Sequence, residues 1–169
     1  MAPRFTVSTM KFEHLIEIND PLNPLMDTLS VEQLWKGLVL RAESPKLFVP
    51  HLDECVIEER GEHSFKRRLR YGKLVVADKV LLQPMRQVVY EVPAQDEIPA
   101  SSLTMTIESP QPEVLWVRFR YEDSNDEATD EANKMYDEFR RSAYQESDID
   151  TIRIVRELAT EGRLGATLN

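Results

Sequence analysis

Apolar and polar residues alternate along most of the chain, most regularly in residues 63–82. Two alternating runs flank Gly72-Lys73, a pair typical of a type II′ hairpin turn in which glycine takes the positive φ. This turn predicts a register in which Arg67 lies opposite Asp78. One side of the hairpin is then apolar except for this charged pair, and the other side is basic. The expected inner residues are Phe65, Leu69, Tyr71, Leu74, Val76 and Val80, and the expected outer ones are Lys66, Arg68, Arg70, Lys73 and Lys79.

The segments on either side of the hairpin also alternate and predict further strands. These strands cover residues 11–18, 54–59, 87–92, 101–108 and 114–121. His14 lies on the apolar side of the first one. The strand after Gln83 continues the inner face of the hairpin only if the connecting turn has an odd number of residues, and we expect an odd turn. Consecutive strands joined by short turns predict an antiparallel meander with one dry face.

Helical spacing replaces the alternation in two segments near the start of the chain. Ser30 and Gln33 form a capping box ahead of a helix whose apolar positions continue to Ala42. Ser44-Pro45 suits the cap and first position of a second, short helix. Two short helices therefore separate the first strand from the meander.

The last part of the chain predicts one long helix. We expect it to begin at a second capping box, formed by Ser124 and Glu127, and to end near Glu161-Gly162, where glycine can take a left-handed cap. Its first apolar stripe contains Met135, Tyr136 and Phe139. Later apolar residues, from Ile149 onward, lie on a rotated face, so the helix could bend near residues 145–147.

Length and charge restrict the classes of function. The chain has 169 residues and a formal net charge of -9. This length predicts a single domain, in which we expect residues 1–10 and 163–169 to be loose. The negative charge predicts no nucleic-acid binding, because phosphate contacts need clustered Lys and Arg. The basic run at residues 66–70 is interpreted as a solvated strand face. No apolar run approaches the ~20 residues of a membrane helix, so no membrane insertion is expected.

The reactive residue types predict neither metal nor nucleotide chemistry. Cys55 is the only cysteine, which excludes an internal disulfide and favours a reducing, cytoplasmic location. The three histidines are far apart in the sequence and have no metal-ligand spacing. With five glycines and no glycine-rich phosphate loop, the chain is expected to use no cofactor.

The order of the elements is one strand, two short helices, a run of about six antiparallel strands and a long helix. This order resembles the helix-grip fold of the START-like (SRPBCC) superfamily, an α+β fold with a curved sheet around the last helix. Local stretches are similar to the AtaL-like branch of that superfamily. They read FEHLIEIND, LWKGL, SPKLFVPHLDEC, FKRRLRYG and VADKVLLQP. The resemblance implies a hydrophobic cavity between sheet and helix and a lipid-like or aromatic ligand. Some relatives are enzymes, but no catalytic motif carries over to these residues.

The residues expected to line the cavity come from the inner strand faces and the first stripe of the last helix. They are His14, Arg67, Leu69, Tyr71, Val76, Asp78, Tyr90, Met105, Phe119, Tyr121, Met135, Tyr136 and Phe139. Arg67 and Asp78 are interpreted in one of two ways. They form a structural ion pair, or the Arg67 guanidinium binds an acidic ligand while Asp78 holds the arginine in place. His14 is either a hydrogen-bonded core residue or a general acid/base.

Three functions remain open at this point. The first is a non-catalytic protein that binds a small hydrophobic or aromatic ligand. The second is a cofactor-independent enzyme of the polyketide cyclase/aromatase type that works by acid/base catalysis. The third is a protein-binding accessory factor whose pocket is filled by side chains. Trp116, expected on the outer face of the sheet, could mark a homodimer contact.

Overall fold

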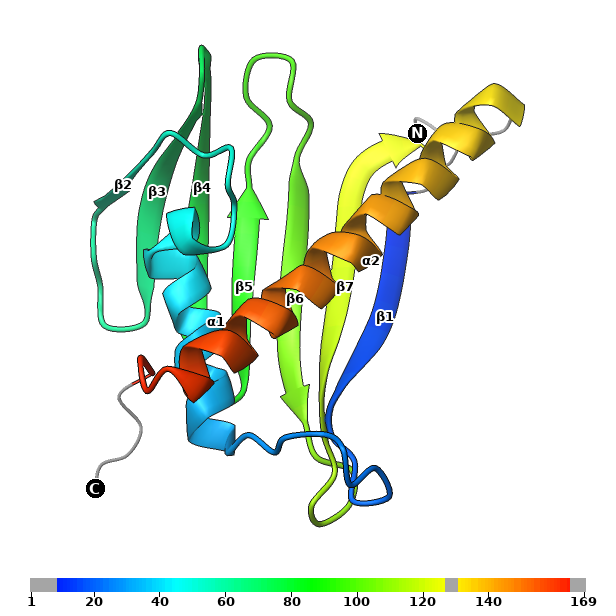
Figure 1. Cartoon of the computed structure of the whole chain (residues 1–169). Helices are drawn as coiled ribbons and strands as arrows, with labels where there is room; N and C mark the ends of the chain where they lie inside the picture. The colour runs from blue at the N-terminus through cyan, green and yellow to red at the C-terminus, as the bar shows by residue number, and fades with distance from the viewer. Residues whose placement is uncertain (1–8, 127–130, 165–169) are drawn as a thin grey trace, which may run out of the picture.

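Seven strands in the described part of the chain form one antiparallel sheet, with two α-helices beside it (Figure 1). The structure is a computed structural model and describes residues 9–126 and 131–164. The sheet order is β1-β7-β6-β5-β4-β3-β2, so the first strand pairs with the last. The strands are β1 (Thr9–Asn19), β2 (Glu54–Glu58), β3 (Ser64–Tyr71), β4 (Leu74–Gln83), β5 (Gln87–Val92), β6 (Ser101–Glu108) and β7 (Leu115–Asp126). The helices are α1 (Val31–Glu43) and α2 (Glu131–Thr160), and η1 (Pro45–Leu47) is a 3-10 turn.

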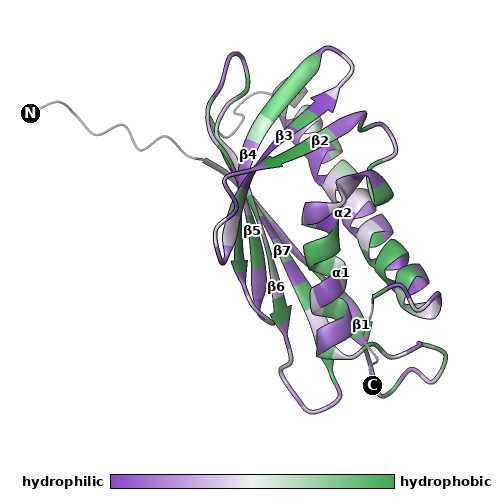
Figure 2. Ribbon diagram, turned by 90° about the vertical axis from the view of Figure 1, so that its left-hand side faces the viewer, coloured by the Kyte–Doolittle hydropathy of each residue, from purple (hydrophilic) through white to green (hydrophobic). Residues whose placement is uncertain are grey.

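Both helices lie on the same side of the curved sheet (Figure 2). Helix α2 runs diagonally across the sheet, and α1 lies beside its C-terminal half (Figure 1). Every neighbouring pair of strands is antiparallel. A curved antiparallel sheet that wraps a long final helix is the helix-grip arrangement, and it confirms the predicted α+β fold class.

The two tight turns of the meander have the predicted lengths. Gly72 has a φ of +60°, and Tyr71 pairs with Leu74 across it, so the first turn has two residues. Arg67 pairs with Asp78 as predicted. The second turn spans residues 84–86 between the paired ends of β4 and β5. Its odd length keeps the inner faces of β4 and β5 continuous.

The start of α1 follows the predicted cap. The Ser30 hydroxyl accepts a hydrogen bond from the Gln33 backbone N–H, and the Gln33 side chain accepts one from the Ser30 backbone N–H. The second helix is shorter than predicted. Ser44 caps a single 3-10 turn that begins at Pro45, since the chain must then turn to enter β2.

The predicted start of the last helix is wrong. Strand β7 continues to Asp126, so Ser124 is a strand residue. Glu127, the other half of the expected capping box, lies outside the described residues. Antiparallel pairing of Asp126 with Thr9 of β1 explains the extension, because pairing in the sheet supplies backbone hydrogen bonds that a helix start would forgo.

The far end of α2 confirms the predicted glycine cap. The helix is continuous through residues 145–147 and ends at Thr160. Gly162 has a φ of +71°, and its N–H donates to Ala159 O while Arg163 N–H donates to Leu158 O. These two bonds form a Schellman motif. The expectation of a loose tail from residue 163 is wrong at its first positions, because Leu164 is buried in the core.

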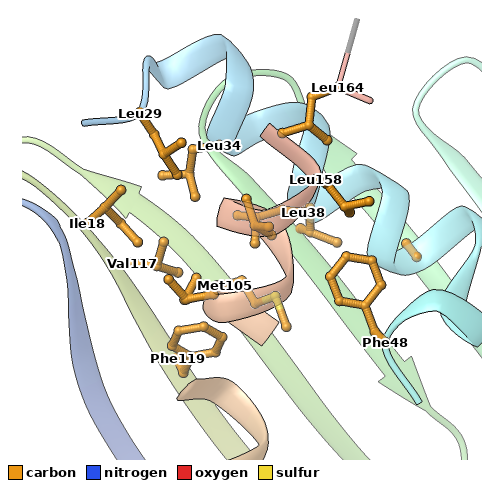
Figure 3. Packing of buried hydrophobic residues seen from close by; sticks show 14 of the residues in the cluster. Ile18, Leu29, Leu34, Leu38, Phe48, Met105, Val117, Phe119, Leu158 and Leu164 are labelled. Atoms are coloured by element: carbon orange, nitrogen blue, oxygen red, sulfur yellow. The ribbon is translucent and has the colours of Figure 1, made fainter. Parts of the chain in front are cut away.

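The core lies between the inner face of the sheet, α1 and the C-terminal half of α2 (Figure 3). Leu34 and Leu38 of α1 meet Val155 and Leu158 of α2 over the sheet residues. Gly37 lets the helices approach closely, since a Cβ at this position would lie 2.6 Å from a Val155 methyl group. The fully buried side chains from the sheet include Ile18, Phe65, Val80, Val88, Met105, Val117 and Phe119.

The N-terminal half of α2 turns its predicted apolar stripe away from the sheet. Met135 and Phe139 are each 71% exposed and Tyr136 is 61% exposed. The side that faces the sheet carries mainly polar residues in this half and apolar ones in the other. From one end to the other it presents Arg140, Tyr144, Asp148, Thr151, Ile152, Val155 and Leu158.

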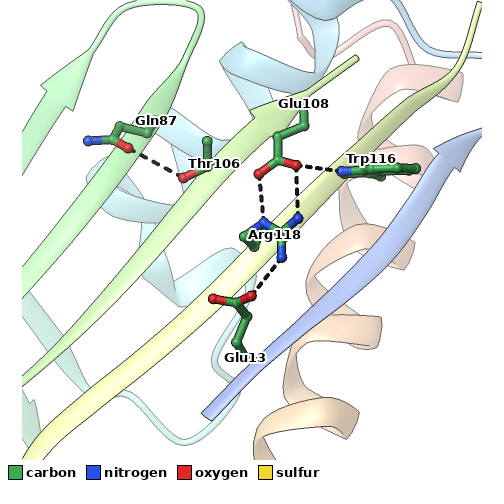
Figure 4. Close-up of polar contacts among 6 residues, drawn as sticks. All are labelled: Glu13, Gln87, Thr106, Glu108, Trp116 and Arg118. Carbon is green, nitrogen blue, oxygen red and sulfur yellow. Dashed lines mark hydrogen bonds and ion pairs between the residues drawn. The ribbon is translucent and has the colours of Figure 1, made fainter. Parts of the chain in front are cut away.

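The outer face of the sheet carries a polar network around Arg118 (Figure 4). This arginine binds Glu108 from β6 at 2.7 Å and Glu13 from β1 at 2.6 Å. The hydrogen bonds from Arg118 hold the pKa of Glu108 below its ordinary value. Trp116 donates its indole N–H to Glu108 at 2.9 Å. It is half-buried in this network, so it projects less than the sequence suggested.

Candidate ligand pocket

A cavity of about 380 Å³ lies under the N-terminal half of α2. It is bounded by the ends of β3 and β4 next to the Gly72 turn, by β5, β6 and β7, and by Arg41 of α1. Its walls combine aromatic, aliphatic and charged side chains. The lining residues are Arg41, Arg67, Leu69, Tyr71, Val76, Asp78, Tyr90, Val92, Ser101, Ser102, Leu103, Tyr121, Glu122, Asp123 and Tyr144.

The structure places the expected cavity residues in four different surroundings. Seven line the cavity: Arg67, Leu69, Tyr71, Val76, Asp78, Tyr90 and Tyr121. Met105 and Phe119 are fully buried in the core. His14 lies behind the cavity wall and reaches it through hydrogen bonds. Met135, Tyr136 and Phe139 do not face the cavity, because that part of α2 presents Arg140 and Tyr144 to the sheet instead.

Arg67 and Asp78 form a buried, bidentate ion pair in the cavity wall. Arg67 Nε donates to Asp78 Oδ1 at 2.9 Å, and Nη2 donates to Oδ2 at 2.5 Å. Nη1 donates to the carbonyl of Ala42 at 3.0 Å, which ties the hairpin to the end of α1. The two side chains are 6% and 4% exposed. The guanidinium fork is therefore occupied by the aspartate, as a structural pair requires.

Tyr90 lies beside two arginines in the same wall. The Cζ atoms of Arg41 and Arg67 are each 5.0 Å from its ring centroid, a distance at which cations interact with an aromatic face. Tyr90 is 4% exposed. Among the described side chains, its hydroxyl is the one fully buried polar atom that makes no hydrogen bond.

A buried carboxyl group connects the cavity to His14. The Tyr121 hydroxyl donates to Asp148 Oδ1 at 2.6 Å, and His14 Nε2 lies 2.7 Å from Oδ2. Asp148 is completely buried, and burial raises its pKa above the ordinary value. Burial, and after it the Asp148 carboxylate, also raises the pKa of Tyr121. The three groups form a continuous path along which a proton could move.

The wall around Tyr121 is built from stacked rings. Tyr121 and Tyr144 stack with centroids 4.0 Å apart and planes 8° apart. Tyr144 also accepts a hydrogen bond from Arg140 at 3.3 Å, and Arg140 forms an ion pair with Asp123. This arrangement fixes one end of the cavity, where β7 passes under α2.

Comparison with known proteins assigns the chain to a family. The sequence model of AtaL, acetylaranotin biosynthesis cluster protein L, matches residues 16–162. The chain belongs to the AtaL family. This result confirms the resemblance seen in the sequence. No curated protein sequence matches the AtaL-family chain.

Solved structures share the fold of this AtaL-family chain at low sequence identity. Zhui aromatase/cyclase from Streptomyces sp. R1128 has a TM-score of 0.62 and 16% identity, over 94% of this chain and 98% of that one. The di-domain aromatase/cyclase StfQ of the steffimycin biosynthetic pathway has a TM-score of 0.66 and 13% identity. That match covers 90% of this chain and 52% of StfQ, so the chain spans about half of the di-domain protein. Human STARD10 has a TM-score of 0.59 and 11% identity, over 90% and 66% of the two chains.

Two charged residues of the site are not predicted from the sequence: Arg41, which lines the cavity, and Asp148, which lies behind its wall. Arg41 belongs to the same helical stripe as Leu34 and Leu38, three and seven residues further on, so the spacing is consistent with its inward position. Asp148 shares a stripe with Val155 in the same way. The spacing alone does not predict that either faces inward, because charged residues are rarely buried without a partner.

Two further features were sought in the described part of the chain: a metal site and a membrane-spanning helix. Within residues 9–126 and 131–164, no group of three His, Cys, Asp or Glu side chains is arranged to hold a metal ion. None of the described helices is long and apolar enough to cross a membrane. The cavity has aromatic walls and two guanidinium groups, that of Arg67, which is paired with Asp78, and that of Arg41. It also adjoins the hydrogen-bonded path from Tyr121 through Asp148 to His14.

Proposed function

We propose that this AtaL-family protein binds a small hydrophobic or aromatic molecule in the cavity under α2. The observation that carries the proposal is the cavity itself, about 380 Å³ between four tyrosine rings and aliphatic strand residues. Pockets of this size with mainly apolar walls and a few placed polar groups are typical sites for small organic ligands. The aromatase/cyclase and STARD10 structures with the same fold support the proposal by analogy.

A blocked cavity tests the proposal. Val76 lines the cavity, whereas the adjacent Val75 is 47% exposed, since successive strand residues point to opposite faces. Val76→Trp should abolish binding of aromatic probes such as 2-naphthol, measured by fluorescence titration, and Val75→Trp should leave it unchanged. Native mass spectrometry of the protein from its own source would show any bound molecule. Equal binding by both variants would refute the cavity as the site.

A second candidate function is a cofactor-independent cyclase/aromatase, and the path from Tyr121 through Asp148 to His14 favours it. Cyclisation of a poly-β-keto chain needs a base for the carbon between two carbonyls and an acid for the oxygen that leaves as water. Turnover of a poly-β-keto substrate should then fall at least about 100-fold in Asp148→Asn, with ligand binding retained. If the wild-type protein shows no turnover, the cyclase function is wrong and only the ligand-binding function remains.

The remaining expectations stay predictions. An accessory factor without a working pocket would need the cavity to be filled, and its volume argues against that. A homodimer through the outer face would involve Trp116, and sedimentation of Trp116→Ala against the wild type would detect it. The cytoplasmic location inferred from Cys55 also stays a prediction.

A further inference from the structure

Within the described residues, two polar groups in the cavity wall each lack one kind of partner: Arg41 has no carboxylate beside it, and the Tyr90 hydroxyl makes no hydrogen bond. Arg41 lines the cavity, and its Nε donates to the Thr151 hydroxyl at 3.3 Å. Within the described residues, no carboxylate lies within 4.0 Å of its guanidinium nitrogens. Tyr90, under the same guanidinium, has the buried hydroxyl without a hydrogen bond. Buried polar groups are normally satisfied, so an unsatisfied one needs an explanation.

The other charges of the cavity wall are already balanced. Each carboxylate that lines the cavity has an arginine beside it. The pairs are Arg67–Asp78, Arg120–Glu122 and Arg140–Asp123. Arg41 is therefore the lining cation whose charge no adjacent carboxylate offsets.

Asp148 acts on Arg41 through space but does not bind it. Its two oxygens are bound by Tyr121 and His14 instead. The positive potential of Arg41 is directed into the cavity, where low-dielectric walls strengthen its effect on a ligand.

We propose that the cavity selects ligands with an acidic oxygen, such as an aromatic carboxylic acid, and that Arg41 and the Tyr90 hydroxyl bind this oxygen. The inference rests on the proposed ligand-binding function and names the chemical class of the ligand. Arg41 supplies the charge, and a ligand oxygen gives the Tyr90 hydroxyl the hydrogen bond that it lacks. Arg67 is excluded from this role because Asp78 and the Ala42 carbonyl occupy its fork and one further N–H. Its guanidinium also contacts the Tyr90 ring.

A matched pair of probes tests the inference. 2-Naphthoic acid and 2-naphthamide have the same ring system and nearly the same size, but only the acid is charged at pH 7. Isothermal titration calorimetry should show tighter binding of the acid by wild-type protein. Arg41→Met should weaken binding of the acid by about 10-fold to 100-fold and leave the amide unchanged. Tyr90→Phe should weaken binding of the acid by about 2-fold to 10-fold.

Two control variants separate the local effect from net charge and folding. Arg86→Met makes the same change in net charge, but residue 86 lies in the turn between β4 and β5, which contributes nothing to the cavity lining. It should keep the preference for the acid. Arg41→Lys retains the charge and should restore part of the preference. Unchanged binding of the amide shows that the cavity of each variant is intact.

The outcomes distinguish this inference from the proposed function. If wild-type protein binds acid and amide equally, or if Arg41→Met keeps the preference for the acid, the selection of acidic ligands is wrong and the binding function stands. If wild-type protein binds neither probe, the result counts against both.

Discussion

Removing the guanidinium of Arg67 should destabilise the fold strongly, because the removal leaves Asp78 as a buried carboxylate without its partner. Both side chains are about 5% exposed, and two hydrogen bonds of 2.9 and 2.5 Å join them. Breaking one half of such a pair costs about 3–5 kcal/mol. Arg67→Met also removes a bond to the Ala42 carbonyl, worth about 1 kcal/mol. Together these losses amount to about 4–6 kcal/mol, so the midpoint of thermal unfolding should fall by roughly 8–24 °C.

A double-mutant cycle isolates the pair from the packing change. The free energies of unfolding of Arg67→Met, Asp78→Val and the double variant are measured by urea denaturation. We expect the double variant to be more stable than Arg67→Met, because replacing both charges with apolar groups leaves no unpaired charge in the interior. Arg68→Met provides the control, since Arg68 pairs with Glu58 on the exposed side of the same hairpin and its loss should cost less than about 1 kcal/mol.

One result would refute this reasoning. If Arg67→Met lost no more stability than Arg68→Met, water entering from the cavity would have to solvate Asp78 in the folded protein. The pair would then behave as an exposed one, and its burial in the static structure would not describe its energetics. The ion pair would also cease to be an argument for a rigid cavity wall.

Three further predictions follow from the same core. Tyr90→Phe should not destabilise the ligand-free protein, and should stabilise it by up to about 1–3 kcal/mol, because the variant removes an unsatisfied buried hydroxyl; a lower unfolding midpoint would contradict this. Gly37→Ala should cost about 1–2 kcal/mol in urea denaturation, because its Cβ would meet Val155 at 2.6 Å; unchanged stability would mean that α1 can shift. The raised pKa of Asp148 means that the folded state holds its proton to higher pH than the unfolded state, so stability falls as pH rises above the unfolded value of about 3.9. Asp148→Asn can keep the bond from Tyr121 and should gain stability relative to wild type over that pH range; a constant difference from pH 4 to 8 would be inconsistent with the shift.

The amino-acid sequence by itself determined the tight turns, one cap of each helix and the faces of the strands. The Gly72-Lys73 turn and the odd turn before β5 set the registers that oppose Arg67 and Asp78. The capping box at Ser30 and the glycine at residue 162 set one end of each helix. All of these features depend on residues only a few positions apart, so local conformational preferences were sufficient to predict them.

Tertiary structure decided the parts of the cavity that come from different elements. Pairing of Asp126 with Thr9 of β1 extended β7 past Ser124, against the local signal for a helix. The diagonal path of α2 left Met135 and Phe139 exposed and brought Tyr144 and Asp148 over the sheet. The helical spacing of Met135, Phe139, Tyr144 and Asp148 is visible in the sequence. Which side of a helix becomes buried, however, depends on where the helix crosses the sheet, and only the packing of the whole core determines that crossing.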